Sequence, residues 1–439
     1  MDSLHIVDSR TGNNYTVTIQ NNYIKAIDIR KITAPRTGIE NGDAVRNAEA
    51  LRILDNGLQN TAVMKSSITL VDGHKGLIKY RDLHIEQLFH DFVYEDVMHL
   101  IIWGKLPQQK QKDEVRAVMN KAMTPIPTVI DVISSFPRDA EICPMILAGM
   151  CAFMAADETM GATRREQKPT FHGNLGLADQ ALQRTIAYLA TTIALVHCHK
   201  VGIAFTPPEP GRSLIGNLLL MMGVQDSQMV ERCLDKLWIL YADHELTNST
   251  AATLHAGSTL TDPVSAIISG IISGFGPLHG GAINLAYDAF RLIGAPENVP
   301  AFIDAIKARK GRLFGYGHRI YKTRDPRVAL IQELMQEYRT AVDANPLLRI
   351  AMAVDKVANQ DPYFVDRGLK ANADLLGCFL YKAMGFDDDM IMPIIILSRV
   401  PGVLAHWRES LTQPVMLWRS QQIYEPEGTI HAYQAGAHL

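Results

Sequence analysis

The pattern of hydrophobic and polar positions changes period near residue 85, which divides the chain into a short β-rich start and a long helical remainder. Apolar and polar residues alternate over residues 4–29 around polar turn residues, and this predicts a small β-hairpin or meander. Residues 68–71 and 77–80 flank the turn sequence of residues 72–76 and predict a second hairpin. From Ile85 onward the apolar residues recur at the spacing of amphipathic helices.

Helical segments separated by Pro- and Gly-rich breaks continue almost to the end of the chain. Residues 33–47 are rich in Pro, Gly, Asp and Asn and predict a loose connection. The sequence contains no βαβ alternation, no phosphate-binding loop, no dinucleotide fingerprint and no repeat of fixed period. We therefore predict a mainly α protein with a small N-terminal β segment. The expected breaks fall at Pro107, 124–127, Pro137, 205–211, 276–281, 311–317, 361–368 and Gly385.

Length, composition and charge limit the class of protein. The 439 residues exceed one typical domain, so we expect two domains or one large domain with a lid. The formal net charge of -3 argues against nucleic acid as the main partner, although it leaves room for a local basic pocket. The five cysteines are scattered and form no Cys-x-x-Cys pair. We interpret them as reduced core residues of an intracellular protein.

We expect neither secretion nor membrane insertion. The N-terminus is polar, without the apolar stretch of a signal peptide or the Arg-rich character of a mitochondrial transit peptide. Residues 263–287 lack a formal charge, but their glycines and His279 favour a buried helix followed by a glycine-rich loop. The final residues Ala437, His438 and Leu439 resemble variants of the peroxisomal C-terminal address. The expected location is the peroxisome if this tripeptide acts as an address, and otherwise the cytoplasm.

Residues 315–327 carry the clearest candidate chemistry. Gly315 and Gly317 precede His318 and allow the backbone to turn tightly and approach a ligand. Arg327 follows a proline, which makes the chain locally stiff. A neutral imidazole can donate a hydrogen bond to a carbonyl, and a guanidinium can donate two to a carboxylate. The stretch is therefore suited to hold both ends of a small oxo acid, although alone it is also typical of a plain surface turn.

Four further clusters surround this stretch in the sequence. They lie at the end of an apolar helix (242–250), in a glycine-rich loop before the next helix (276–282), at a helix start (372–374) and at residues 398–402. Taken singly, their side chains also fit structural roles such as core histidine, N-cap aspartate or surface charge. The candidate residues are His244, His279, Asp374 and Arg399, with Arg419 lying beyond the last cluster.

A metal site is not expected. His197 and His199 flank Cys198 in a metal-like arrangement, but a ligand pair without a third ligand is more typical of packing.

Together, these clusters resemble the citrate synthase family over residues 27–424. Residues 72–81 look like the family's first hairpin, and residues 135–137 and 143–145 match its helix boundaries. The resemblance implies a mainly α, citrate synthase-like two-domain helical fold and a homodimer or higher homo-oligomer. The implied organisation is an N-terminal β segment and linker (1–47), a large helical domain (48–281), a small helical lid domain (282–387) and a return to the large domain (388–439).

The resemblance also implies a Claisen-type condensation of an acyl-CoA with oxaloacetate, without metal or redox cofactor. A proton on the α-carbon of a thioester is weakly acidic, so a base must be helped by a donor at the developing oxyanion. Three arginines suit a dicarboxylate that becomes a tricarboxylate. The implied roles are oxaloacetate binding by His244, His318, Arg327, Arg399 and a partner subunit's copy of Arg419; proton abstraction by Asp374; hydrogen bonding to the thioester oxygen by His279; polarisation of the keto oxygen by His318; and contacts with CoA phosphates by Lys322 and Arg319.

The sequence departs from the family beside two of these residues. Leu375 and Leu376 follow the aspartate where the family usually has an aromatic residue or His and then Ser-Gly, and Ile283 stands before Asn284 where Asn is usual. We expect a more apolar wall near the acyl group. We therefore predict a longer-chain alkylcitrate synthase, with ordinary citrate synthase or 2-methylcitrate synthase as the alternative.

Two other classes stay open at this point. A metal-dependent hydrolase built on His and Asp would need a bound metal, and a non-catalytic binder of CoA or tricarboxylates would bind its ligand without releasing a thiol.

Overall fold

The computed structural model describes residues 1–35, 48–166, 168–225, 227–318 and 320–423. The chain divides into two units, one made of residues 1–65 with the chain from Arg419 onward and the other of residues 66–418. The predicted mainly α fold is confirmed, since strands are confined to residues 3–84 of the described chain.

The first unit contains short antiparallel strand pairs. Strand β1 (Ser3–Asp8) pairs with β2 (Asn13–Thr18), as the alternation over residues 4–29 predicts. Helix α1 (Ala26–Ile29) precedes β3 (Thr33–Pro35), which pairs with β4 (Ala48–Ala50). The loose connection predicted over residues 33–47 is wrong for residues 33–35, which form β3 by pairing with β4, and the rest of it lies outside the described residues.

The second unit begins with a three-stranded antiparallel sheet and is otherwise helical. The sheet has the order β5 (Thr69–Asp72), β6 (Leu77–Tyr80) and β7 (Leu83–His84), which confirms the second predicted hairpin. The helices are α2 (Ile85–Asp91), α3 (Tyr94–Trp103), α4 (Gln109–Ala122), α5 (Pro127–Ser134), α6 (Ile142–Ala156), α7 (Glu158–Glu166), α8 (Leu175–Val201), α9 (Leu214–Met221), α10 (Ser227–Tyr241), α11 (Asn248–Gly257), α12 (Pro263–Gly274), α13 (Ala282–Ile293), the 3-10 helix η1 (Pro296–Asn298), α14 (Val299–Lys307), α15 (Arg327–Glu337), α16 (Arg339–Ala344), α17 (Pro346–Ala358), α18 (Pro362–Val365), α19 (Asp374–Ala383) and α20 (Asp388–Ser410).

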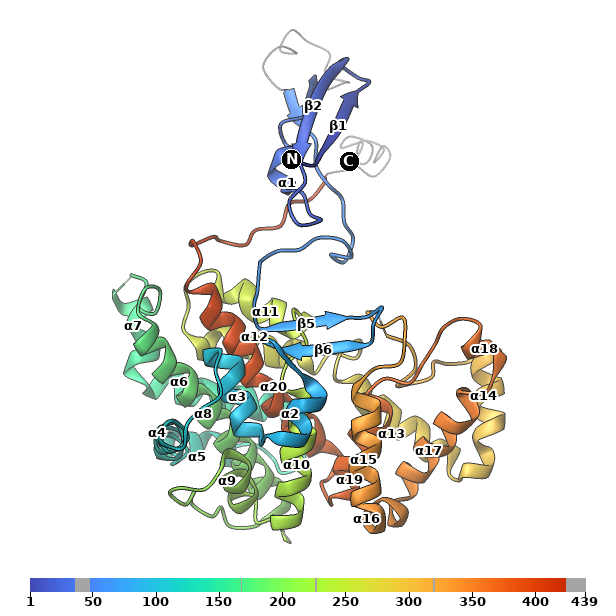
Figure 1. Ribbon diagram of the computed structural model, residues 1–439. Helices are drawn as coiled ribbons and strands as arrows, with labels where there is room; N and C mark the ends of the chain where they lie inside the picture. The colour runs from blue at the N-terminus through green and yellow to red at the C-terminus, as the bar shows by residue number, and fades with distance from the viewer. Residues whose placement is uncertain (36–47, 167, 226, 319, 424–439) are drawn as a thin grey trace, which may run out of the picture. The chain divides into compact units, whose positions relative to one another are not determined.

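Helix α20 is the central helix of this unit. It packs against α3, α8, α10, α11 and α12, and also against α13 and α19 (Figure 1). By length and composition α20 is apolar enough to cross a membrane, but 89% of its most apolar window is buried inside the protein. Trp407 and Ile394 of this helix are fully buried. The apolar character of α20 therefore reflects its position in the core.

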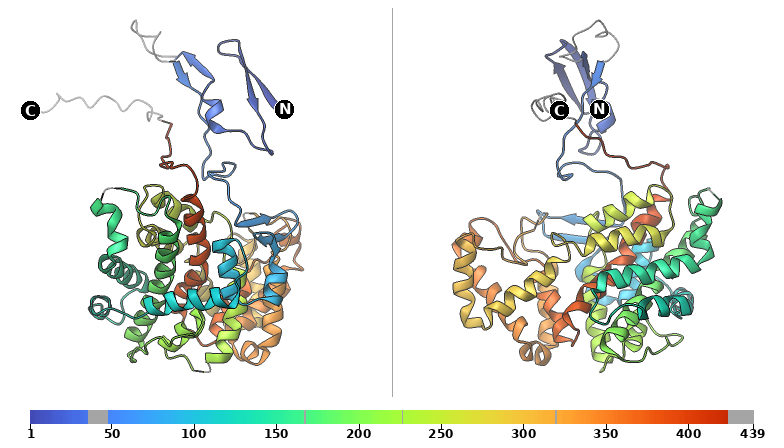
Figure 2. Two further views of the ribbon diagram at one scale, coloured as in Figure 1. Left: turned by 60° about the vertical axis from the view of Figure 1, so that its left-hand side comes forward. Right: turned by 180° about the vertical axis from the view of Figure 1, so that it is seen from behind.

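Two groups of helices in the second unit lie on either side of α20. Helices α4 to α9 gather on one side and α13 to α19 on the other (Figures 1 and 2). Because residues 66–418 form one compact unit, the division into a large domain and a closing lid at residues 282–387 stays a prediction.

The β5–β6 hairpin is fixed to the helical core by buried tyrosine and glycine contacts. The hydroxyl of Tyr80, on β6, donates to the carbonyl oxygens of Ile239 at 3.0 Å and Asp243 at 3.1 Å. In the turn, a Cβ on Gly73 would overlap the carbonyl group of Ile320, and the Lys322 N–H donates to the Gly73 oxygen at 2.9 Å. The hairpin thus lies against two loops that carry predicted site residues.

All five cysteines are free. Cys198, Cys233 and Cys378 are buried, as expected of core residues. The expectation is wrong for Cys151, which is exposed on α6, because the apolar sequence of that helix does not tell which face is covered.

Candidate active site

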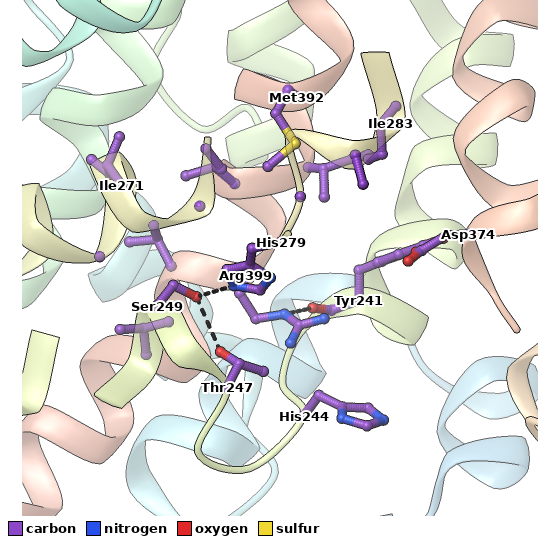
Figure 3. A pocket seen from close by; sticks show the side chains of 18 of the residues that line it. Tyr241, His244, Thr247, Ser249, Ile271, His279, Ile283, Asp374, Met392 and Arg399 are labelled. Atoms are coloured by element: carbon purple, nitrogen blue, oxygen red, sulfur yellow. Dashed lines mark hydrogen bonds between the residues drawn. The ribbon is translucent and has the colours of Figure 1, made fainter. Parts of the chain in front are cut away.

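Six of the predicted site residues line one cavity of about 290 Å³. They come from the loop after α10, the turn before α13, the loop before α15, the starts of α15 and α19 and the middle of α20 (Figure 3). The sequence therefore identified side chains that lie far apart along the chain and close together in the fold. These residues are His244, His279, His318, Arg327, Asp374 and Arg399.

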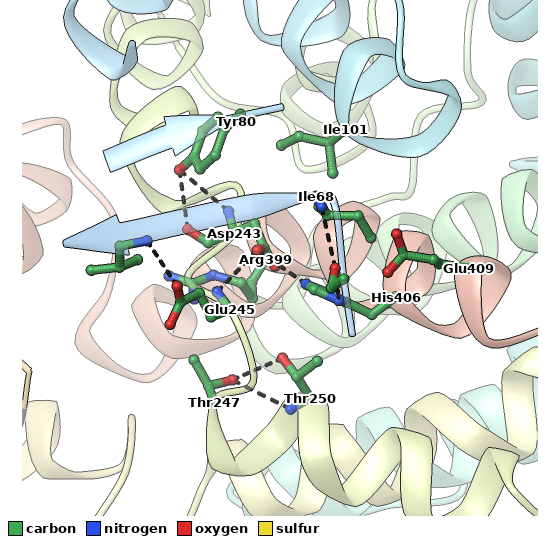
Figure 4. A network of polar contacts seen from close by, with 12 residues as sticks. Ile68, Tyr80, Ile101, Asp243, Glu245, Thr247, Thr250, Arg399, His406 and Glu409 are labelled. Atoms are coloured by element: carbon green, nitrogen blue, oxygen red, sulfur yellow. Dashed lines mark hydrogen bonds and ion pairs between the residues drawn. The ribbon is translucent and has the colours of Figure 1, made fainter. Parts of the chain in front are cut away.

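The loop after α10 is held on both sides of His244. The buried Asp243 carboxylate accepts a hydrogen bond from the Glu245 N–H at 3.0 Å and pairs with Nε2 of His406 at 3.2 Å (Figure 4). Glu245 adopts a left-handed conformation with φ of 57°, and its carboxylate accepts from the Val71 N–H of β5 at 2.8 Å. These contacts fix the backbone on both sides of His244.

The Asp243–His406 pair is fully buried. Burial alone would lower the pKa of His406, but the charge of Asp243 and the hydrogen bond to it outweigh burial and raise this pKa. For Asp243, burial alone would raise the pKa, but the charge of His406 and the hydrogen bond from His406 lower this pKa below its usual value. The pair therefore favours the charged forms of both groups beneath the His244 loop.

His244 and His318 are adjacent histidines in the cavity. Their ring centroids lie 5.4 Å apart, and His244 Nε2 lies 2.8 Å from the Tyr321 hydroxyl. Burial, followed by the charges of Arg327 and Arg399, lowers the pKa of His244 well below its usual range. Burial and then Arg327 lower the pKa of His318 as well. Both rings are thus neutral near pH 7.

The tautomer of His318 follows from its own loop. Its Nδ1 accepts hydrogen bonds from the backbone N–H groups of Ile320 at 3.1 Å and Tyr321 at 3.4 Å. Because Nδ1 acts as an acceptor, the proton of the neutral ring is on Nε2. His318 can therefore donate a hydrogen bond to a carbonyl oxygen from Nε2.

One buried carboxylate connects Arg327 to the start of α19. Asp325 accepts two parallel bonds from the Arg327 guanidinium, at 3.0 Å from Nε and 2.7 Å from the second nitrogen. The same carboxylate accepts from the backbone N–H of Ala373 at 3.0 Å. Arg327 is 5% exposed, so its charge needs this partner. The other terminal nitrogen of Arg327 does not bond to Asp325, and the Arg327 side chain lines the cavity.

Asp374 is the first residue of α19 and is held by contacts from two other segments. Asn372 accepts from the Asp374 N–H at 3.0 Å through its side-chain oxygen, and its amide nitrogen donates to the Gly317 carbonyl at 3.0 Å. The Tyr241 hydroxyl lies 3.3 Å from Asp374 Oδ1. The carboxylate therefore has a fixed position beside the His318 loop.

His279 and Arg399 lie in the middle of the cavity in Figure 3. His279 Nε2 is 3.0 Å from the Ser249 hydroxyl, which is also 3.0 Å from the Thr247 hydroxyl. Burial, followed by the charge of Arg399, lowers the pKa of His279, so this ring is also neutral near pH 7. Arg399 Nε donates to the carbonyl oxygen of Tyr241.

The rest of the cavity lining is largely apolar. The turn from α12 to α13 contributes part of it, as the sequence predicts for a buried helix followed by a glycine-rich loop. Most of the remaining side chains belong to α12 and α20. The apolar side chains are Ile267, Ile271, Leu278, Ile283, Phe314, Met392, Ile395, Ile396, Val400 and Val403.

The comparisons with known proteins identify the family. A family model described as the C-terminal domain of citrate synthase matches residues 57–421. The chain belongs to the citrate synthase family. It is an enzyme of the citrate synthase type, a transferase.

Related proteins match the family assignment along nearly the whole chain. A citrate synthase-like protein from Phoma sp. is 44% identical over 425 residues, covering 97% of this chain and 90% of its own. An alkylcitrate synthase from Talaromyces stipitatus is 35% identical over 424 residues, covering 96% and 94%. The peroxisomal citrate synthase 1 of Arabidopsis thaliana is 33% identical over 442 residues, covering 98% and 88%.

A solved structure supports the same assignment. Citrate synthase from Thermoplasma acidophilum, in a ternary complex with carboxymethyl coenzyme A and oxaloacetate, is 25% identical with a TM-score of 0.77. The match covers 86% of this chain and 97% of that one.

One expectation drawn from this family resemblance is wrong. Ile283 lines the cavity, but Leu375 and Leu376 do not. A Cβ on Gly315 would overlap Leu375, so this leucine packs against the His318 loop, and Leu376 lines a separate cavity with α15, α16 and α17. Successive helical residues point in directions about 100° apart, so the neighbours of Asp374 face away from its side.

The three other predicted site residues are Lys322, Arg419 and Arg319. Lys322 lies in the His318 loop with an exposed side chain, outside the cavity lining. Arg419 has an exposed side chain and belongs to the other unit. Arg319 lies outside the described residues. Their roles in a citrate synthase-type enzyme stay predictions.

Sequence reasoning gave no role to four residues that support the candidate active site of this protein. Tyr241 ends α10 immediately before the 242–250 cluster, and Asp325 lies within the 315–327 stretch, so both were close to recognised residues. The contacts that give Ser249 and Tyr321 their importance join positions 30 and 77 residues apart. Such partners become visible only in the folded chain.

No group of three or more His, Cys, Asp or Glu side chains that could hold a metal ion occurs among the described residues. In the metal-like stretch near residue 198, His199 Nε2 lies 2.8 Å from the carbonyl oxygen of Phe136.

Proposed function

We propose that this enzyme condenses the α-carbon of an acyl-CoA with oxaloacetate to give a 2-alkylcitrate and free CoA. The observation that carries the proposal is the convergence of three neutral histidines, two arginines and one aspartate on a single cavity whose remaining lining is largely apolar. The polar groups suit a small oxo diacid, and the apolar part suits an alkyl chain.

Oxaloacetate is bound by the basic part of the cavity. Arg327 and Arg399 donate to its carboxylates, and His244 and His318 donate as neutral rings. His318 Nε2 polarises the keto oxygen, which makes the keto carbon a better electrophile. Arg419 of a partner subunit adds a third guanidinium in a homodimer, which matches the third carboxylate of the product.

The condensation proceeds by proton transfer followed by carbon–carbon bond formation. Asp374 takes a proton from the α-carbon while His279 donates a hydrogen bond to the thioester oxygen, where negative charge develops. The enol or enolate carbon attacks the keto carbon of oxaloacetate, and the former keto oxygen becomes a hydroxyl after protonation. Water then cleaves the thioester, forming the third carboxylate and releasing the CoA thiol.

Lys322 and Arg319 contact the CoA phosphates as positive charges. Residues 282–387 act as a lid that closes over both substrates and excludes water, which strengthens the hydrogen bonds from His279 and His318. The Thermoplasma acidophilum complex with a coenzyme A analogue and oxaloacetate supports this choice of substrate pair.

Within this reaction class we propose an acyl chain longer than propionyl. Support comes from the alkylcitrate synthase relative and from the aliphatic side chains that α12 and α20 contribute to the cavity. The alternative is an ordinary citrate synthase or 2-methylcitrate synthase, which the 33% identity to the Arabidopsis thaliana enzyme favours.

Thiol release with oxaloacetate and acetyl-, propionyl-, hexanoyl- and octanoyl-CoA tests the function. We expect kcat/KM to be higher for the longer thioesters than for acetyl-CoA, because a pocket typically discriminates one methylene by about 10- to 200-fold. An advantage of acetyl-CoA of about a hundredfold or more would identify an ordinary citrate synthase. Thiol release that does not require oxaloacetate would contradict the condensation.

We also propose a peroxisomal location, directed by Ala437, His438 and Leu439. These residues lie outside the described chain, and support comes from their sequence and from the peroxisomal Arabidopsis thaliana relative. Deleting the tripeptide should move a tagged protein from peroxisomes to cytosol without changing its activity. A cytosolic location of the intact protein would disprove this targeting.

A further inference from the structure

The apolar part of the cavity lies between α12 and α20, on the far side of His279 from His244. Figure 3 shows Met392 and Ile283 on one side of His279 and His244 on the other. The two helices pack against each other, and their facing residues include Gly274 on α12 and Ile396 on α20. A chain attached to a thioester beside His279 would therefore enter the space between these helices.

The lack of a side chain at Gly274 leaves part of this space open. A Cβ at this position would lie 3.5 Å from Cδ1 of Ile396 and 3.9 Å from Cε of Met392, which are ordinary van der Waals distances. The backbone of Gly274 is helical and has no positive φ. Neither packing nor backbone conformation thus requires glycine here, although glycine in a helix is less favourable than alanine.

Met392 occupies part of this space, next to the residue that follows His279. A Cβ on Gly280, the residue after His279, would overlap the terminal methyl group of Met392. The methionine side chain is 4% exposed, so it lies inside the protein at this point. With three rotatable side-chain bonds and no branches, Met392 can change conformation at low cost when a ligand enters.

We propose that Met392, Gly274 and Ile396 determine the acyl chain length that this enzyme accepts. The first carbons of the chain displace the Met392 methyl group beside His279, and the following carbons occupy the space that Gly274 leaves in front of Ile396. This inference rests on the proposed condensation, and it assigns chain-length selection to α12 and α20 and not to the residues that follow Asp374.

The test compares variants by one ratio, kcat/KM for octanoyl-CoA divided by kcat/KM for acetyl-CoA. Gly274→Val places two methyl groups in the gap and should lower the ratio at least tenfold, while Gly274→Ala should lower it less. Met392→Ala removes the displaced side chain and should raise the ratio. Ile396→Phe should lower it, because the ring fills the end of the gap.

Matched substitutions outside the cavity control for general effects. Gly176→Ala adds a Cβ in α8, where the nearest atom would lie 3.9 Å away, and Met98→Ala removes a methionine that is 2% exposed in α3. Both should leave the ratio within about twofold of the wild-type value. Melting temperatures of all variants show whether each is folded, and if Gly274→Val does not fold, the ratio of Gly274→Ala decides.

The outcomes separate the inference from the proposed function. If the wild type condenses several acyl-CoAs but the Gly274 and Met392 variants keep the wild-type ratio, the inference is wrong and the condensation stands. If the wild type accepts acetyl-CoA alone, the inference is also wrong, since no longer chain enters. If no thioester releases thiol in the presence of oxaloacetate, both fail.

Discussion

The Tyr241 hydroxyl lies 3.3 Å from Oδ1 of Asp374 and 3.1 Å from the carbonyl oxygen of Ala373. Burial raises the pKa of Tyr241 well above its usual range, so the hydroxyl keeps its proton and donates it in a hydrogen bond. The carbonyl oxygen of the same residue accepts from Arg399. Tyr241 therefore contacts both Asp374, the proposed base, and Arg399, which is proposed to bind oxaloacetate.

Replacing Tyr241 with Phe should lower kcat roughly 2- to 10-fold, the scale of one neutral hydrogen bond of about 0.5–1.5 kcal/mol. The KM for oxaloacetate should change less than about twofold, because the backbone carbonyl that faces Arg399 remains. Steady-state kinetics at saturating acyl-CoA measures both constants.

Tyr188→Phe is the matched control, since it removes a tyrosine hydroxyl that donates to Asp157 at 2.8 Å outside the cavity lining. Equal effects of the two substitutions on kcat would show that Tyr241 has no special relation to Asp374.

Asp374→Asn should reduce thiol release by about 100-fold or more, the usual scale for loss of a general base. Oxaloacetate affinity, measured by calorimetry, should stay nearly unchanged because the carboxylate acts on the other substrate. The amide is nearly isosteric, so the contacts of α19 with Asn372 and Asp325 remain. Turnover within a few-fold of the wild type would remove Asp374 from the mechanism.

Arg419→Ala should weaken oxaloacetate binding and reduce activity by about tenfold or more, because one guanidinium–carboxylate contact is lost. If Arg419 serves the site of the partner subunit, mixing this variant with His279→Ala should restore activity in some sites of mixed dimers. Subunit exchange is verified by mass spectrometry before the assay. Activity that stays at the level of the separate variants would indicate that each site is built from one chain.

The Asp243–His406 pair predicts a dependence of stability on pH. Because the pKa of His406 is raised by Asp243 in the folded protein, the protonated ring stabilises the fold below about pH 6.5, and this contribution is lost as pH rises through the raised pKa. Glu409 adds to the effect and Arg81 opposes it. His406→Gln should therefore destabilise the protein at pH 6, by about 1–3 kcal/mol.

The difference between His406→Gln and the wild type should narrow as the pH is raised toward 9. Urea unfolding of both proteins across this range measures the difference directly. A gap that stays constant with pH would show that folding does not raise the pKa of His406.

The sequence predicted the helical fold and the main chemical groups well, for physical reasons. Apolar periodicity identified helices from Ile85 onward, and the turn residues of the hairpin at Asp72 marked its strands. His244, His279 and Asp374 were recognisable because each stands at a helix end or loop, where a side chain is free to face a ligand.

The sequence could not show which neighbours face the cavity or which distant residues support it. Leu376 is two positions from Asp374 and points into a different cavity, because a helix turns its side chains through about 100° at each step. Asp325 bonds a backbone N–H 48 residues away, and Tyr241 bonds a carboxylate 133 residues away. Such pairings depend on tertiary packing, which periodicity does not encode.

Gly73 does not line the candidate active-site cavity, yet any side chain at this position would overlap the carbonyl group of Ile320. A side chain at this position would push the hairpin turn away from the His318 loop, which contains Ile320. In a library of random single substitutions, Gly73 should therefore tolerate about as little change as the histidine itself. Engineering that redirects this enzyme toward other thioesters would do well to leave the hairpin turn intact and place all diversity on α12 and α20.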